Sequence, residues 1–136
     1  MKLAFIIPNM KGGGAEKVLF RLLNYIAKNQ NGYDIHLLLA KKEGLLLDGL
    51  NKNIKIFDFN KNHAKNSLFD IINYLRIQKP DYFISSLDYM SLISSLAYKI
   101  SNSKATFLIW EHNNLSIHSK KTISNSLFLN LSLIHI

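Results

Sequence analysis

The sequence has no cysteine, no apolar run long enough to cross a bilayer and only two arginines. The lack of cysteine excludes disulfide bonds and thiolate chemistry, which fits a reducing compartment. The apolar run at residues 3–7 stops at Pro8, and it is too short for a signal peptide or a membrane helix. These absences favour a cytoplasmic protein.

The chain carries an excess of positive charge that is spread along the sequence. There are 17 Lys and Arg residues against 9 Asp and Glu, a net charge of +8, and no single basic run. This balance favours either an ordinary solvated surface or attraction to an anionic partner, such as a nucleotide sugar or a membrane face. No interleaving of basic and aromatic residues occurs, so we expect no nucleic-acid partner.

Apolar periodicity predicts one domain in which strands and helices alternate. The length of 136 residues and the 48% hydrophobic content fit a single core. The chain has five candidate strands, at residues 2–7, 33–40, 53–57, 81–85 and 104–110. Candidate helices cover residues 15–28, 68–79 and 92–100, and Ser67 is the predicted N-cap of the second helix. Two segments are predicted to be polar loops: residues 41–53, which include a short helical turn, and residues 58–66. This order predicts an α/β fold with a doubly wound parallel sheet.

Three consecutive glycines, Gly12, Gly13 and Gly14, join the first strand to the first helix. Glycine lets the backbone approach a ligand closely, and a helix start offers free N–H groups and a positive dipole end. Such a turn can hold a phosphate without a metal. The pattern is neither a dinucleotide fingerprint nor a Walker loop.

A second polar cluster follows the fifth strand, at Glu111, His112 and Asn113. Ligands of parallel sheets bind outside the carboxyl ends of the strands, so this cluster and the glycines can face one site. Asp88 follows the fourth strand at the same edge, although it also suits a helix N-cap. The histidines fit no standard metal spacing, and we expect neither a metal nor a cofactor.

The run Gly13-Gly14-Ala15-Glu16-Lys17-Val18 resembles the N-terminal signature of family 4 retaining glycosyltransferases of the GT-B fold. The stretch from Trp110 to Asn113 is similar to a second motif of that family. The resemblance implies that the three glycines lie near the donor diphosphate and that His112 is the catalytic residue near the donor sugar. Glu16, Glu111, Asn113 and Asp88 would orient groups or bind the acceptor. For Glu16, a plain helix-dipole role is the alternative.

The resemblance covers only half of such an enzyme. We expect residues 1–130 to form the N-terminal, acceptor-side Rossmann-like domain, with the C-terminal donor domain absent and this fragment inactive alone. Residues 119–129 have the pattern of a further amphipathic helix. Residues 131–136 match the translation of a transposase end used in sequencing adaptors, so we expect them to be non-native, with an ordinary apolar tail as the alternative.

The function implied by the resemblance is sugar transfer from a nucleotide-diphosphate sugar to a glycan or lipid-linked acceptor, in bacterial surface polysaccharide synthesis. The spread lysines would suit contact with the inner face of the cell membrane. Two alternatives stay open. One is a non-catalytic nucleotide- or phosphate-binding Rossmann-like module, and the other is a GT-B-like sugar-nucleotide epimerase.

Overall fold

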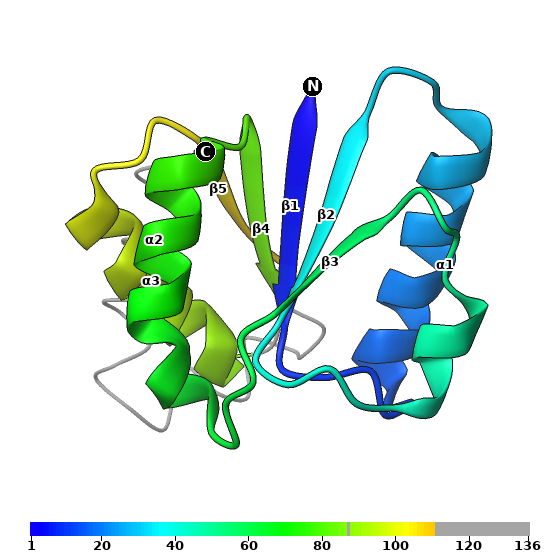
Figure 1. The fold of residues 1–136 in the computed structure, drawn as a ribbon, viewed down its shortest axis with the longest axis horizontal. Coiled ribbons are helices and arrows are strands. Elements are labelled where there is room, and N and C mark those ends of the chain that lie inside the picture. The colour runs from blue at the N-terminus through cyan, green and yellow to red at the C-terminus, as the bar shows by residue number, and fades with distance from the viewer. Residues whose placement is uncertain (87, 111–136) are drawn as a thin grey trace, which may run out of the picture.

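The computed structural model describes residues 1–86 and 88–110, which form a five-stranded parallel sheet between two layers of helix (Figure 1). The strands are β1 (Lys2–Ile7), β2 (Asp34–Leu39), β3 (Lys55–Asp58), β4 (Tyr82–Ser86) and β5 (Thr106–Trp110). The α-helices are α1 (Gly14–Asn29), α2 (Leu68–Gln78) and α3 (Asp88–Ser101), and the short 3-10 helices are η1 (Leu45–Gly49) and η2 (Ala64–Ser67).

The strand order across the sheet is β3-β2-β1-β4-β5, and every neighbouring pair is parallel. The chain moves outward from β1 to β3, then returns to β4 on the other side of β1. Because crossovers between parallel strands are right-handed, this reversal places α1 on one face of the sheet and α2 and α3 on the other (Figure 1). The predicted doubly wound α/β fold is confirmed.

Each face of the sheet has its own apolar core. Alternate residues of a strand point to opposite faces, so the near-continuous apolar runs of β1 and β2 fill both cores. Toward α1 lie Phe5, Ile7, Leu19, Leu23 and Leu37, together with the fully buried loop residue Met10. Toward α2 and α3 lie Ala4, Ile6, Ile71, Leu75 and Phe83. Burial on both faces holds β1 at the centre of the sheet.

Two details of the helices differ from the sequence-based expectation. Ser67 does not cap α2 through its side chain: it ends η2 with a helical backbone (φ −84°, ψ −1°), and the chain runs on directly into α2. The predicted loop at 58–66 therefore already contains part of the helical turn η2. α3 begins at Asp88, four residues before the apolar series from Leu92 that predicted it, and its first turn already buries Met90 in the core.

The helices of the described ranges are too short or too polar to cross a membrane. The predicted helix at 119–129 and the suspected tail at 131–136 lie outside the described residues.

Candidate functional site

The topology defines where a ligand can bind. The chain runs from β1 to β2 and β3 on one side of β1, and the connection that leaves β3 returns to β4 on the other side of β1. In doubly wound sheets the connections diverge at such a switch point and open a crevice outside the carboxyl ends of the strands. The loop at residues 8–13 follows β1 directly, and β4 ends beside it at Ser86. The glycine loop therefore lies at the switch point of this sheet.

The backbone of the glycine loop faces open space. Gly12 has φ +117°, a value that side chains disfavour, and Gly13 is the N-cap of α1 without a side-chain hydrogen bond to the helix start. A Cβ added at Gly12 or Gly14 would meet no heavy atom within 4 Å. Gly12 and Gly14 are thus not required to avoid a clash with the protein itself. They leave the first turn of α1, with its free N–H groups, open to a ligand.

Glu16 lies at the start of α1 and turns back toward Gly13. A Cβ on Gly13 would collide with the Glu16 carboxylate, so the two residues are in close contact. Glu16 is the third residue of the helix, where an acidic side chain is favoured by the helix dipole. The Glu16 carboxylate therefore already lies close to the helix end at which an anion would bind.

The loop after β2 holds the glycine loop in place. Met10 N donates to Glu43 O (3.0 Å), Leu46 N donates to Met10 O (3.2 Å), and Lys41 N donates to Pro8 O (3.1 Å). Gly44 makes this contact feasible, because its φ is +131° and a Cβ there would overlap the Met10 carbonyl group. Sequence reasoning missed Gly44, although a glycine inside a polar segment signals a sharp turn or a close approach.

Charges beside the loop are partly paired. Lys11 Nζ lies 3.0 Å from Glu43 Oε1, and Lys41 Nζ lies 3.9 Å from Glu43 Oε2. The hydrogen bond from Lys11 holds the pKa of the Glu43 carboxyl below its ordinary value. These two lysines therefore serve the contact between the loops as well as adding positive charge to the edge.

Several predicted site residues cannot be placed. Glu111, His112 and Asn113 lie outside the described residues, and so does the side chain of Asp88, whose backbone starts α3. Trp110, which precedes them, is the last residue of β5 and pairs in register with Ser86. β5 thus ends at the same edge of the sheet as the glycine loop.

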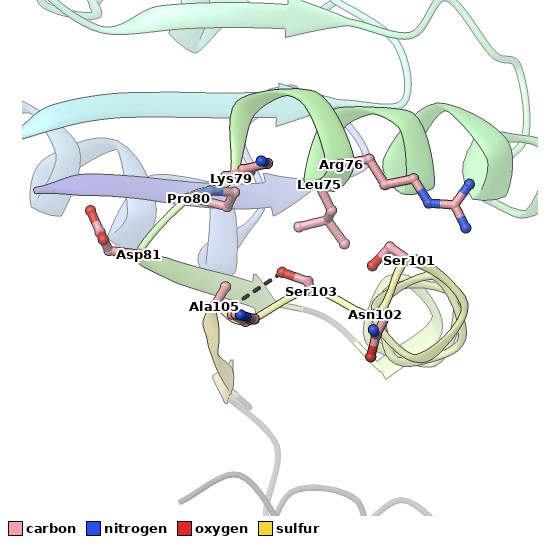
Figure 2. A pocket seen from close by; sticks show the side chains of 10 residues that line it. Leu75, Arg76, Lys79, Pro80, Asp81, Ser101, Asn102, Ser103 and Ala105 are labelled. Atoms are coloured by element: carbon pink, nitrogen blue, oxygen red, sulfur yellow. Dashed lines mark hydrogen bonds between the residues drawn. The ribbon is translucent and has the colours of Figure 1, made fainter.

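A cavity of about 460 Å³ lies at the opposite, amino-terminal edge of the sheet (Figure 2). The cations Arg76, Lys79 and Lys104 line it with Asp81, beside the ends of α2 and α3. Arg76 donates to the Ile100 carbonyl at 3.2 Å, and Asp81 accepts from the backbone of Lys2 at 2.7 Å. Cations are favoured at helix carboxyl ends, so this set stabilises the helix ends. No predicted site residue lines the cavity.

In the described ranges, histidines and acidic residues form no group of three that could hold a metal ion. The described groups at the carboxyl edge of the sheet are backbone N–H groups, hydroxyls and scattered charges. Such groups bind and orient oxygen-rich anions.

The strand order and the glycine turn at the switch point define a Rossmann-like domain. No protein-family model and no curated protein matches the sequence. Among solved structures, the lipopolysaccharide outer core galactosyltransferase WaaB in its apo form is similar, with a TM-score of 0.65 and 20% identity over 86% of this chain. MurG of Acinetobacter baumannii is similar with a TM-score of 0.58 and 19% identity over 96% of this chain.

At these identities the likeness shows the fold, which is that of GT-B glycosyltransferases. The chain spans 35% of WaaB and 39% of MurG. It therefore corresponds to much less than the whole of either protein.

Proposed function

We propose that this chain is the N-terminal, acceptor-side domain of a retaining family 4 glycosyltransferase. The complete enzyme would transfer a sugar from a nucleotide-diphosphate sugar to a glycan or lipid-linked acceptor in bacterial surface polysaccharide synthesis. The observation that carries the proposal is the open glycine turn, which starts α1 at the switch point of a GT-B-like sheet.

The glycine loop acts on the leaving group. Sugar transfer leaves negative charge on the departing diphosphate, and N–H groups fixed in advance stabilise such charge without reorganising. Gly12, Gly13 and Gly14 keep side chains out of this space, and the contact with Gly44 holds the loop in one conformation. The loop needs no metal for this role, since the helix start supplies the positive potential.

The remaining roles rest on the family resemblance. His112 positions the donor sugar, as an imidazole can donate to or accept from a hydroxyl. Glu111, Asn113 and Asp88 orient groups or bind the acceptor. Glu16 keeps two alternatives, an acceptor contact or a helix-dipole partner, and its contact with Gly13 supports the second.

The test uses the protein expressed from its complete genomic reading frame, assayed for release of nucleoside diphosphate from nucleotide sugars in the presence of lipid-linked acceptors. We expect transfer with retained anomeric configuration, measured by NMR of the product. His112→Ala should lower kcat/KM at least about tenfold, because it removes a hydrogen bond to the sugar. The exposed loop residue His63 gives a matched control, since His63→Ala should leave the rate unchanged.

The alternatives give different products. An epimerase would change the configuration of the sugar nucleotide and transfer nothing. A binding module would hold nucleotides tightly in this chain alone, whereas the proposed enzyme takes most donor contacts from the other domain. A reading frame that stops soon after codon 130, without a second Rossmann-like domain, would rule out the enzyme.

A further inference from the structure

Ser86 carries a buried hydroxyl that the fold does not use. Its side chain is 3% exposed, and its Oγ has no hydrogen-bond partner. Burying an unpaired hydroxyl destabilises the folded state, so folded proteins rarely keep one without a reason. Two other buried atoms in the described ranges share this state, but His36 Nε2 has a carboxylate oxygen of Asp34 3.1 Å away and Ser67 belongs to η2 on the other face.

The hydroxyl of Ser86 faces the side of the sheet that carries α1. Side chains alternate along β4. Ser85 points toward α3, where its Oγ is 3.1 Å from Ser91 Oγ and 3.3 Å from Ser94 Oγ. Ile84, one residue earlier, packs in the core on the α1 side. Ser86 therefore shares its face of the sheet with the start of α1.

Ser86 also lies at the right edge of the sheet. Ile6 pairs with Ser85, so Ser86 stands beside the end of β1, where the chain enters the glycine loop. Neighbouring strands are about 4.8 Å apart. On its other side Ser86 pairs with Trp110, which packs on the same core as Ile84. The unpartnered hydroxyl is thus at the switch point, on the same face and edge as the helix start.

Building on the proposed function, we propose that Ser86 is a ligand-binding residue that donates a hydrogen bond to a phosphoryl oxygen held at the glycine loop. The free N–H groups of the first turn of α1 approach this space from the β1 side, and the Ser86 hydroxyl approaches it from β4. All of these groups are donors, and a diphosphate supplies acceptor oxygens in several directions. The cost of the unpaired hydroxyl in the free protein is removed when the ligand binds.

The experiment is a titration of the 136-residue chain with inorganic pyrophosphate at constant ionic strength, followed by amide NMR shifts and paired with urea unfolding. We expect pyrophosphate to shift the amide signals of residues 12–16. Ser86→Ala should weaken pyrophosphate binding about 5- to 10-fold, the loss of one hydrogen bond to a charged group. The same variant should be as stable as the unaltered chain or more stable, because it removes an unpaired buried hydroxyl.

Ser85→Ala is the matched control on the opposite face of β4. It should lower stability, since it breaks the bonds with Ser91 and Ser94, and leave pyrophosphate affinity unchanged. Unaltered pyrophosphate affinity in Ser86→Ala, with the loop signals still shifting, would overturn the role of Ser86 and leave the proposed function intact. No shift of the loop signals in the unaltered chain would overturn the phosphoryl site at the glycine loop and with it the role of Ser86, whereas the proposed function is tested separately by sugar transfer with the complete protein. If glucose rather than pyrophosphate shifts the loop signals in a Ser86-dependent way, the phosphoryl assignment is wrong.

Discussion

At the scale of single residues, Gly44 does more for the site than its place in a polar loop suggests. Its backbone (φ 131°, ψ 156°) occupies a region that is essentially limited to glycine, and its Cα lies against the Met10 carbonyl. The hydrogen bonds between Met10 and the loop after β2 depend on this approach. A residue far from the glycine loop in sequence thereby sets the loop's conformation.

Gly44→Ala should lower the free energy of unfolding by about 2–4 kcal/mol, because it adds both a backbone penalty and a steric overlap. Gly32 also has a positive φ (94°), but open space surrounds it. Gly32→Ala should therefore cost only about 1 kcal/mol. Urea denaturation of both variants measures the difference, and equal losses would show that the Met10 contact carries no weight.

His36 gives the fold a dependence on pH. The ring is buried against Phe57, with Nδ1 2.7 Å from the Tyr74 hydroxyl and Nε2 3.1 Å from Asp34 Oδ2. Burial lowers the pKa of His36 below its ordinary value, although Asp34 opposes the shift. The folded protein thus binds this proton less readily than the unfolded chain does.

The stability that depends on neutral His36 should be fully present above the unfolded pKa of about 6.5 and decline as pH falls through the lower folded pKa. His36→Gln should flatten the pH dependence of the urea midpoint in this range, while His63→Gln, in an exposed loop, should not. A midpoint that rises as pH falls below 6.5 would show that His36 is charged in the fold.

At the scale of elements, the carboxyl end of α2 contains one strained backbone conformation that a substitution can relieve. Lys79 ends the helix in the left-handed conformation (φ 46°, ψ 61°), which glycine adopts at little cost and lysine does not. Its backbone N–H donates to Leu75 O, so the turn itself closes the helix, while the side chain is exposed beside the amino-edge cavity.

Lys79→Gly should raise the free energy of unfolding by roughly 0.5–1 kcal/mol. Asn102 closes α3 with φ 54°, and Asn102→Gly should gain less, since asparagine tolerates this conformation. Thermal unfolding of the two variants compares them. A loss of stability in Lys79→Gly would mean that the lysine side chain stabilises the fold by more than its left-handed backbone conformation destabilises it.

At the scale of the whole molecule, the net charge of +8 should attract the protein to anionic partners. If the protein works at the inner face of a membrane, it should sediment with vesicles that contain phosphatidylserine and not with vesicles of phosphatidylcholine alone. Binding should weaken steeply as NaCl rises from about 50 to 300 mM, because exposed charges are screened over about 10 Å or less. Equal binding to both kinds of vesicle would contradict a role of charge.

The sequence by itself determined the alternation of strands and helices, the parallel sheet and the glycine turn at the start of α1. These features depend on local signals: apolar spacing, glycine clusters and short polar breaks act within a few residues. The same signals missed the early start of α3, although its first turn buries Met90, and they placed Ser67 correctly at the N-cap position of α2 without showing that its side chain makes no cap hydrogen bond. The roles of His112 and its neighbours remain predictions.

Only the tertiary structure decided what surrounds the glycine turn. The contact of Gly44 with Met10 joins residues far apart in sequence, and the unpaired hydroxyl of Ser86 is recognisable only once its neighbours on both strands are known. The physical reason is that strand order and burial are set by the packing of the two cores, in which distant segments exclude water together. No short stretch of sequence contains that information.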